Sequence, residues 1–179
     1  KPNLLLGTDL SGSTVGLIGM GPIGQAVAKR LKGFGCHVLA WNRTPREVAG
    51  VEFTDLETLL SNADIVSLHT ALTDDTRGMI SRERLGLMKD QAMLINTARG
   101  GIVDEMALVE ALATGRLRAG LDVYAEEPLP LDSVFRSLPG CVLLPHVGSA
   151  TDRTRRAMFE LALANLVAGM QDEPLPAAL

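Results

Sequence analysis

Three short polar segments of this sequence could carry out chemistry, because each places a reactive side chain directly after an apolar run. The side chains are those of Arg99, Glu127 and His146, in segments 96–101, 121–128 and 144–149. Carbonyl reduction needs a cation that holds an anionic substrate, a proton donor and a carboxylate that orients the donor. The three residues therefore form a candidate catalytic set, provided that the fold brings them together.

A fourth segment is suited to binding a ligand. Gly19, Gly21 and Gly24 have the G-x-G-x-x-G spacing, after an apolar run and before a helical pattern that begins with Pro22 and Ile23. In dinucleotide-binding folds the first glycine permits a tight turn, the second admits a pyrophosphate and the third lets the helix lie close to the strand. Free N–H groups at the helix N-terminus then face the phosphates. The segment predicts a dinucleotide site, the alternative being a glycine-rich turn without a ligand.

The residues after the second apolar run indicate which dinucleotide binds. NAD enzymes usually place a carboxylate about 20 residues beyond the glycines, where it accepts the ribose 2′-hydroxyl. Here Asn42, Arg43 and Thr44 occupy that region. Asn42 cannot repel a 2′-phosphate, and Arg43 can pair with one. The segment favours NADPH over NADH, unless Arg43 and Arg46 are only solvated loop charges.

Short apolar runs alternate with helical patterns along the chain. The predicted strands are 14–18, 38–41, 65–68, 92–96, 119–123 and 142–144, and the predicted helices 22–31, 54–60, 81–88, 104–113 and 151–168. Thr54 and Glu57 resemble a capping box at the start of the second helix. This alternation predicts an α/β doubly wound, Rossmann-like parallel sheet covered on both faces. The polar segments all follow strands, so they meet at the carboxyl edge of the sheet, where ligands bind.

Composition narrows the class of protein further. The 179 residues are 46% hydrophobic and 21% charged, and the net charge is −4, which predicts one soluble globular domain without nucleic acid as a partner. The apolar runs are too short to cross a membrane. Two cysteines do not make a disulfide framework, which favours a reduced, cytoplasmic setting, and we predict no metal site. Because the first residue is Lys1 rather than Met, we expect a piece of a longer protein.

Taken together, these segments resemble the D-isomer-specific 2-hydroxyacid dehydrogenase family, from Asp9 to Pro176. Within the family, the stretch 141–154 and the ending 169–176 look most like glyoxylate/hydroxypyruvate reductases. The resemblance implies that Arg99 holds the carboxylate or oxo group of a small 2-oxo acid. It also implies that His146 protonates the carbonyl oxygen as hydride arrives, and that Glu127 stabilises the protonated imidazole.

The resemblance further implies contacts with the cofactor. Asp122 would bond the nicotinamide carboxamide, Thr97 and Gly148 would line the same pocket, and Ala71 would lie against the cofactor. His37 and His69 are given no catalytic role, although His69 lies at the exit of a predicted strand near the cofactor.

Members of this family have two domains, of which this chain resembles the cofactor domain. We expect a linker at 1–13, the NAD(P)-binding domain at 14–168 and a tail at 169–179 that returns toward a substrate domain. That substrate domain is absent from the sequence, so the chain should bind cofactor but reduce substrate poorly. The resemblance also implies a homodimer formed through the cofactor domain.

Two alternatives remain open at this point. One is another 2-oxoacid reductase of the same family, such as a 2-ketogluconate reductase or a phosphoglycerate dehydrogenase. The other is a non-catalytic dinucleotide sensor like the corepressors that resemble this family. The intact set of Arg99, Glu127 and His146 argues against the sensor, which needs no proton donor.

Overall fold

The computed structural model describes residues 7–44 and 46–177. These residues fall into two compact units, of which the first ends at Pro145 and the second begins at His146. Residues 1–6 of the expected linker and residues 178–179 of the expected tail lie outside the described part of the chain.

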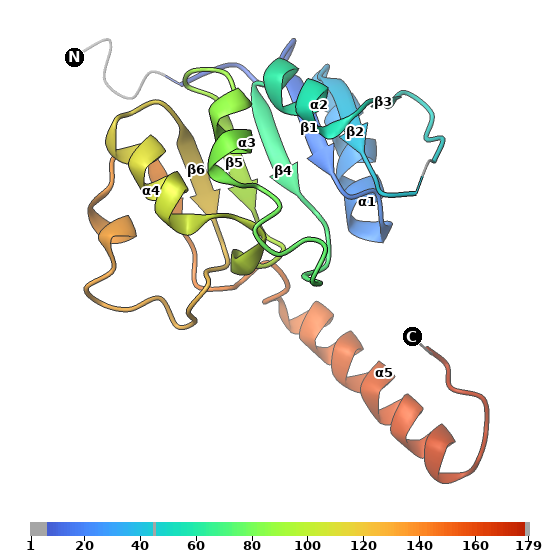
Figure 1. The fold of residues 1–179 in the computed structure, drawn as a ribbon. Coiled ribbons are helices and arrows are strands. Elements are labelled where there is room, and N and C mark those ends of the chain that lie inside the picture. The colour runs from blue at the N-terminus through green and yellow to red at the C-terminus, as the bar shows by residue number, and fades with distance from the viewer. Residues whose placement is uncertain (1–6, 45, 178–179) are drawn as a thin grey trace. The chain divides into compact units, whose positions relative to one another are not determined.

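The first unit is built on a parallel sheet (Figure 1), as the alternation of strands and helices predicts. The strand order is β3-β2-β1-β4-β5-β6-β7. Their bounds are β1 (Thr14–Ile18), β2 (His37–Trp41), β3 (Glu52–Phe53), β4 (Ile65–Leu68), β5 (Met93–Asn96), β6 (Arg118–Leu121) and β7 (Cys141–Leu143). The order reverses between β1 and β4, so the connections from these two strands leave in opposite directions. Such a switch point is where open α/β sheets bind ligands.

Two details of the predicted elements were wrong around residue 54. Strand β3 was not predicted, because its two residues pair only with Leu39 and Ala40 at the sheet edge and are too few to show a period. The capping residue of α2 (Leu56–Asn62) is Asp55, whose carboxylate accepts the Thr58 N–H at 2.8 Å. Thr54 stands one residue before the N-cap, and its N–H donates to Ala40 O and continues the sheet.

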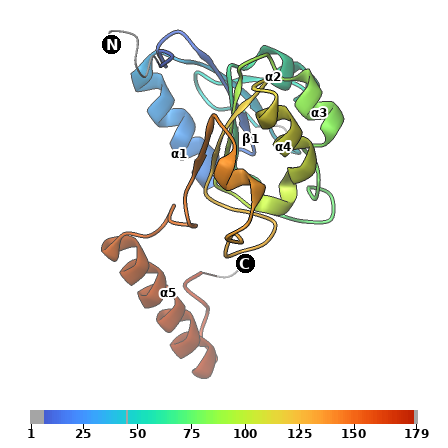
Figure 2. The same ribbon diagram turned by 90° about the vertical axis from the view of Figure 1, so that its left-hand side faces the viewer.

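Helices lie on both faces of the sheet. Their bounds in the first unit are α1 (Pro22–Leu31), α2, α3 (Arg82–Leu87) and α4 (Glu105–Ala113), with short 3-10 turns at Lys32–Phe34, Gly100–Ile102 and Val134–Ser137. Figure 2 shows α1 on one side of the sheet and α2, α3 and α4 on the other. Side chains alternate along β1 accordingly, so that Leu17 packs in the cluster of α1 and Ile18 in the cluster of α2.

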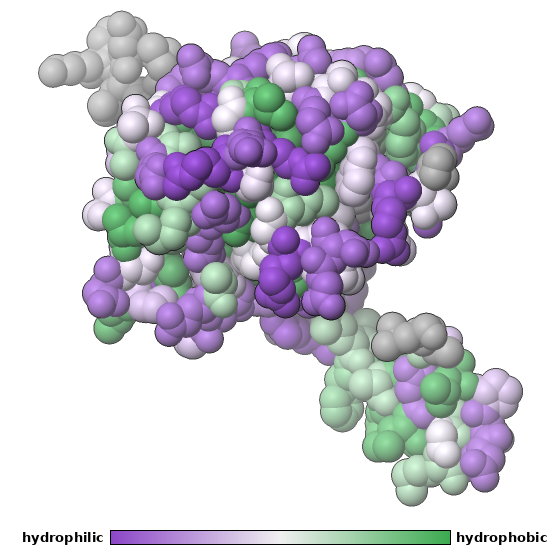
Figure 3. All heavy atoms as spheres, viewed as in Figure 1, coloured by the Kyte–Doolittle hydropathy of each residue, from purple (hydrophilic) through white to green (hydrophobic). Residues whose placement is uncertain are grey.

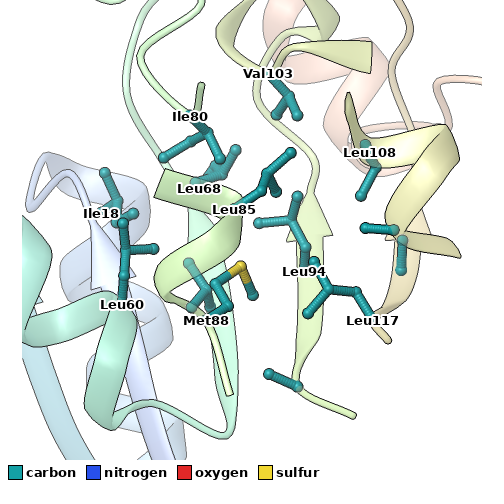
Figure 4. Packing of buried hydrophobic residues seen from close by; sticks show 14 of the residues in the cluster. Ile18, Leu60, Leu68, Ile80, Leu85, Met88, Leu94, Val103, Leu108 and Leu117 are labelled. Atoms are coloured by element: carbon teal, nitrogen blue, oxygen red, sulfur yellow. The ribbon is translucent and has the colours of Figure 1, made fainter. Parts of the chain in front are cut away.

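The larger core cluster lies between the central strands and the three helices of one face (Figure 4). Leu68 and Leu94 from the strands, Leu85 from α3 and Leu108 from α4 are almost completely buried. Burying each of these side chains stabilises the fold by about 1.5–3 kcal/mol. This core fixes the ends of β4 and β5, from which the polar loops leave.

Asp64 ties the start of β4 to two neighbouring segments and should make stability depend on pH. Its Oδ2 accepts the Thr14 N–H at 2.9 Å, and its Oδ1 accepts Lys89 Nζ at 2.8 Å. The bond from Lys89, with help from Thr14, lowers the pKa of this carboxyl. A lowered folded-state pKa stabilises the fold above the unfolded pKa of about 4, and this contribution is lost as pH falls through the folded value.

We therefore expect Asp64→Asn to lower the free energy of unfolding at neutral pH by no more than about 1 kcal/mol, because the side chain is 43% exposed. The difference from the parent chain should shrink as the pH falls through about 4, in urea unfolding measured at several pH values. Asp90→Asn is the matched control, since it removes a carboxylate next to Lys89 without either of these hydrogen bonds. Equal pH dependence of the two variants would contradict the assignment.

The second unit contains α5 (Asp152–Met170), capped by the Thr151 hydroxyl, which accepts the Thr154 N–H at 3.2 Å. The helix passes the expected end at Gly169, and the Glu173 N–H then bonds Ala168 O. Asn165 holds the following segment through two hydrogen bonds to the Ala177 main chain. Hydrophobic side chains are exposed along α5 (Figure 3). Within the described residues, no helix combines the length and hydropathy needed to cross a bilayer.

Candidate active site

The glycine turn after β1 is packed too tightly for side chains at two of its three glycines. Gly19 has a φ of +98°, and a Cβ there would lie 2.7 Å from the main chain of His69 after β4. A Cβ on Gly24 would collide with the carbonyl oxygen of Gly19, so α1 lies close against the end of β1. The roles that the motif predicts for these two glycines in shaping the turn are confirmed.

Gly21 differs from its two neighbours because a Cβ there would meet no described atom within 4 Å. It is the N-cap residue of α1, and it has no side chain with which to cap the helix. The first turn, Pro22 to Gln25, is uncharged. An open surface, free main-chain N–H groups and the positive end of a helix suit a phosphate group. These residues therefore fit the pyrophosphate of a dinucleotide.

Asn42 holds the glycine turn to the end of β2. Its Oδ1 accepts the Met20 N–H at 2.9 Å, and its Nδ2 donates to Thr44 O at 2.7 Å. From the sequence, Asn42 is predicted only to avoid repelling a 2′-phosphate. The structure adds that its amide shapes both loops, which one-dimensional spacing could not reveal.

A cavity of about 320 Å³ joins the glycine turn, the end of β2 and the end of β4. Of the residues predicted to bind the cofactor, it is lined by Gly19, Gly21, Asn42, Arg43, Thr44 and Ala71. It is also lined by residues that the sequence analysis did not assign to the site: Trp41, His69, Thr70, Thr73, Asp75, Thr76 and Met79, together with Arg46. Arg43 Nη1 lies 3.3 Å from Asp75 Oδ2, and both side chains are about three-quarters exposed.

A second cavity of about 410 Å³ lies toward the end of β5. Its walls are Ile23 of α1, residues 68–72 after β4 and residues 97–99 after β5. It thus brings together Ile23, Ala71, Thr97 and Arg99 of the predicted site. The guanidinium of Arg99 is exposed and donates to Ala98 O at 2.6 Å. The two cavities share residues 69–71, so they are neighbours, one beside the glycine turn and the other beside Arg99.

The loops of Arg99 and Glu127 are fastened to each other. Gly100 lies directly on the peptide between Tyr124 and Ala125, where a Cβ would overlap main-chain atoms. The Ala125 N–H donates to Glu105 Oε1 at 2.7 Å, and the Tyr124 N–H donates to Glu127 Oε1 at 3.1 Å. Burial raises the pKa of the Glu105 carboxyl.

Buried polar side chains shape the turn that carries Arg99. Asn96 is 1% exposed; its Nδ2 donates to Arg99 O at 2.9 Å and its Oδ1 accepts the Ala98 N–H at 3.0 Å. Asp122 is 3% exposed at the end of β6, and its N–H donates to Asn96 O. Arg99 and Asp122 therefore lie in the segments that follow the neighbouring strands β5 and β6, as the parallel topology predicts.

The segment leading to His146 is anchored at the end of β7. The Leu144 N–H donates to Leu121 O at 2.8 Å, and the Tyr124 hydroxyl donates to Leu144 O at 2.8 Å. His146 follows two residues later with a φ of +55°, and it begins the second unit, which also contains Gly148. Arg99 and Glu127 belong to the first unit, so the meeting of the three catalytic residues stays a prediction.

The exit of β4 contains polar groups that the sequence analysis did not assign to binding. His69 Nε2 lies 3.0 Å from Ser67 Oγ, and burial lowers the pKa of this histidine. Thr70 Oγ1 is buried and has no hydrogen-bond partner among the described residues. The only available sequence signal was their place directly after a strand next to the glycine turn.

Comparison with known proteins gives the family. Residues 1–148 match the profile described as "D-isomer specific 2-hydroxyacid dehydrogenase, NAD binding domain". A glyoxylate reductase of Thermococcus litoralis is 47% identical over 180 residues, which cover 98% of this chain and 54% of that protein. The human glyoxylate reductase/hydroxypyruvate reductase is 43% identical over 185 residues, or 100% of this chain and 56% of that protein. The chain thus spans about half the length of these relatives.

Solved structures agree with this assignment. The TT0316 protein of Thermus thermophilus has a TM-score of 0.94 and 52% identity, covering 98% of this chain and 56% of that one. An acyclic imino acid reductase in complex with NADPH and D-Arg has a TM-score of 0.89 and 32% identity, covering 97% of this chain and 56% of that one. D-lactate dehydrogenase with NAD+ from Lactobacillus jensenii has a TM-score of 0.89 and 33% identity, covering 100% of this chain and 59% of that one. This chain belongs to the D-isomer specific 2-hydroxyacid dehydrogenase family and matches its NAD-binding domain.

Proposed function

We propose that this chain is the cofactor-binding domain of an NADPH-dependent reductase of small 2-oxo acids such as glyoxylate and hydroxypyruvate. The observation that carries the proposal is a pair of cavities that share residues 69–71, one lined by the glycine turn and Arg43 and the other by Arg99. The pair brings a phosphate-binding turn and a cation suited to a carboxylate to neighbouring cavities. The names of the relatives, glyoxylate reductase and hydroxypyruvate reductase, support the substrate class.

The proposed roles follow from the chemistry of the side chains. The bound cofactor supplies a hydride to C2 of the oxo acid. Arg99 pairs with the substrate carboxylate and turns the carbonyl toward the cofactor. His146 donates a proton to the carbonyl oxygen, which receives the displaced electron pair, so that the product is a 2-hydroxy acid. Glu127 stabilises the cationic imidazole before that proton leaves, and Thr97, Asp122 and Gly148 line the nicotinamide end.

Arg43 is proposed to select NADPH through the 2′-phosphate. Its ion pair with Asp75 is exposed and therefore weak, so the guanidinium can turn to a phosphate dianion at little cost. Asp75 opposes this selection, because its carboxylate lines the same cavity and would repel the phosphate. The two residues should therefore change cofactor affinity in opposite directions.

We expect Arg43→Ala to raise the Kd for NADPH about 10- to 100-fold, as expected for loss of a charge-assisted hydrogen bond, with little change for NADH. Asp75→Asn should leave NADPH affinity unchanged or improve it. Titration of the chain with each nucleotide, followed by the fluorescence of the reduced nicotinamide, measures both. A loss of NADH and NADPH affinity in equal proportion would place Arg43 outside the 2′-phosphate site.

The rest of the protein is also a proposal. We propose that residues 14–168 form the NAD(P)-binding domain, between a linker at 1–13 and a tail at 169–179. A substrate domain completes the enzyme, which forms a homodimer through the cofactor domain in the cytoplasm. Exposed apolar residues of α5, such as Phe159 and Leu166, support the view that further protein covers this helix. Sedimentation of the protein that includes the substrate domain tests the dimer.

The activity itself is tested on the protein that joins this chain to its substrate domain. We expect it to oxidise NADPH when glyoxylate or hydroxypyruvate is added. The 179-residue chain alone spans about half the length of its relatives and should bind the cofactor with little turnover, because in this proposal the substrate domain supplies part of the cleft that excludes water. Binding of NADPH without reduction of any 2-oxo acid by the joined protein would favour a dinucleotide sensor instead.

A further inference from the structure

Tyr124 joins two segments to which the proposed reaction assigns a role. Its side chain is buried, and its hydroxyl lies 2.8 Å from Leu144 O and 3.1 Å from Leu121 O, so its one proton is shared between two carbonyl groups. Its main-chain N–H donates to Glu127 Oε1 at 3.1 Å. One residue therefore binds the carboxylate of Glu127 and the main chain two residues before His146.

The segment before His146 depends on main-chain hydrogen bonds, because side-chain burial holds it only weakly. It follows β7 at the edge of the sheet, and Leu144 is 48% exposed. The Leu144 N–H donates to Leu121 O at 2.8 Å and extends the pairing of β6 with β7. The next residue, Pro145, has no N–H with which to continue the ladder. The Tyr124 hydroxyl, which binds the Leu144 carbonyl, thus fastens the segment where the ladder stops.

The conformation of His146 requires a fixed point of this kind. Its φ of +55° lies in the left-handed region, which residues with a side chain seldom occupy. A backbone in this region persists only when the surrounding structure fixes it. Leu144 supplies the fixed point on the N-terminal side, since its N–H is bound by Leu121 O and its carbonyl by the Tyr124 hydroxyl.

Tyr124 itself is firmly placed and remains a hydrogen-bond donor. Gly100 packs so closely on the peptide between Tyr124 and Ala125 that a Cβ there would overlap it. The Ala125 N–H also donates to Glu105 Oε1 at 2.7 Å. Burial raises the pKa of the Tyr124 phenol, so the hydroxyl keeps its proton over the pH range in which histidine titrates. The hydroxyl therefore reaches Leu144 from a fixed origin.

We propose that Tyr124 is a positioning residue for proton donation: its main-chain N–H orients the Glu127 carboxylate, and its hydroxyl fixes the main chain from which His146 continues. The inference rests on the proposed roles of Glu127 and His146 in the reductase. In this role Tyr124 touches neither the substrate nor the cofactor. It should therefore affect kcat and leave cofactor affinity unchanged.

Tyr124→Phe isolates the hydroxyl, because it keeps the ring and the main-chain bond to Glu127. In the protein that includes the substrate domain, we expect kcat with glyoxylate to fall about tenfold and the Kd for NADPH to change less than about twofold. In the 179-residue chain, hydrogen exchange of the Leu144 N–H should become about tenfold faster, because the neighbouring carbonyl loses its bond. Asp64→Asn is the matched control, since it removes hydrogen bonds at the opposite edge of the sheet and should leave kcat unchanged.

A double variant separates positioning from general loosening of the fold. If the hydroxyl acts through His146, Tyr124→Phe should lower kcat less than about twofold once His146→Asn is present, because the positioned group is gone. The proposal is overturned if Tyr124→Phe leaves kcat or the exchange of Leu144 unchanged, if kcat and NADPH affinity fall together, or if the two substitutions lower kcat independently. A parent protein that binds NADPH but reduces no 2-oxo acid would instead overturn the proposed function, and this inference with it.

Discussion

Gly21→Val is expected to abolish binding of a nicotinamide dinucleotide while leaving the chain folded. A Cβ at Gly21 meets no described atom within 4 Å, and the residue lines the first cavity with an extended backbone. The valine should therefore fit the free protein at a cost of about 1 kcal/mol for the poorer helix cap, or about 2–4 °C in melting temperature. In the complex, its methyl groups would occupy the space in which the backbone meets the pyrophosphate.

Gly24→Ala is the matched variant. Alanine has a smaller side chain than valine, yet it should destabilise the fold more than Gly21→Val does. The new Cβ would collide with the carbonyl oxygen of Gly19, a main-chain atom that cannot turn away. We expect a loss of roughly 1–3 kcal/mol in the free energy of unfolding, as for other overpacked sites. Urea unfolding and NADPH titration of the two variants distinguish a ligand-facing glycine from a packing glycine.

The two glycine variants have outcomes that would contradict the account. If Gly21→Val bound NADPH with an affinity close to that of the parent chain, the glycine turn would not hold the phosphates. If Gly24→Ala were as stable as the parent, the close packing of α1 on β1 would not constrain the sequence.

His146→Asn is expected to lower kcat about 100- to 10,000-fold in the protein that includes the substrate domain, the range typical of a lost general acid. Asparagine is a suitable replacement because it tolerates the positive φ of +55° found at this position. The affinity for NADPH should change little, since the phosphate-binding turn is untouched. Steady-state rates with glyoxylate and a cofactor titration measure the two quantities separately.

Glu127→Gln is a second test of proton donation by His146. The glutamine can still accept the Tyr124 N–H through its amide oxygen, so the loop keeps its anchor and only the negative charge is removed. We expect a fall in kcat smaller than that of His146→Asn and no change in cofactor affinity. A His146→Asn enzyme that keeps a tenth or more of the parent kcat would contradict the assignment of the proton donor.

Much of the first unit could be predicted from the sequence because its signals are local. The spacing of the glycines from Gly19 to Gly24 is typical of a turn between a strand and the helix that follows it directly. The structure has β1 before this turn and α1 after it. Alternation of short apolar runs with helical patterns was sufficient for a parallel sheet. The chemistry-bearing loops then followed from topology, since parallel strands end at one edge.

The predictions that were incomplete depend on contacts between distant segments. Strand β3 exists because two residues pair with the edge of β2, and the hydrogen bond from the Thr54 N–H to Ala40 O extends this pairing up to the residue before the Asp55 cap. The side-chain oxygen of Asn42 accepts a hydrogen bond from the N–H of Met20, 22 residues earlier in the chain. Each outcome is decided by a partner far away in sequence, which composition and periodicity do not identify.

The candidate site shows the same division. Arg43 was predicted from its place after the second strand, whereas its exposed partner Asp75 comes from a loop 32 residues away. Thr70 was overlooked because a threonine in a loop carries no motif. Its place in the walls of both cavities and the lack of a partner for its hydroxyl among the described residues are seen only in the three-dimensional structure.

Titration of the 179-residue chain with NADPH and NADH shows whether the carboxyl edge of this sheet binds a dinucleotide. We expect saturable binding of one nucleotide per chain, tighter for NADPH, because we propose that the turn after β1 holds the phosphates and that Arg43 pairs with the 2′-phosphate. Absence of saturable binding of either nucleotide by the folded chain would contradict the claim that the carboxyl edge of this sheet is a dinucleotide site.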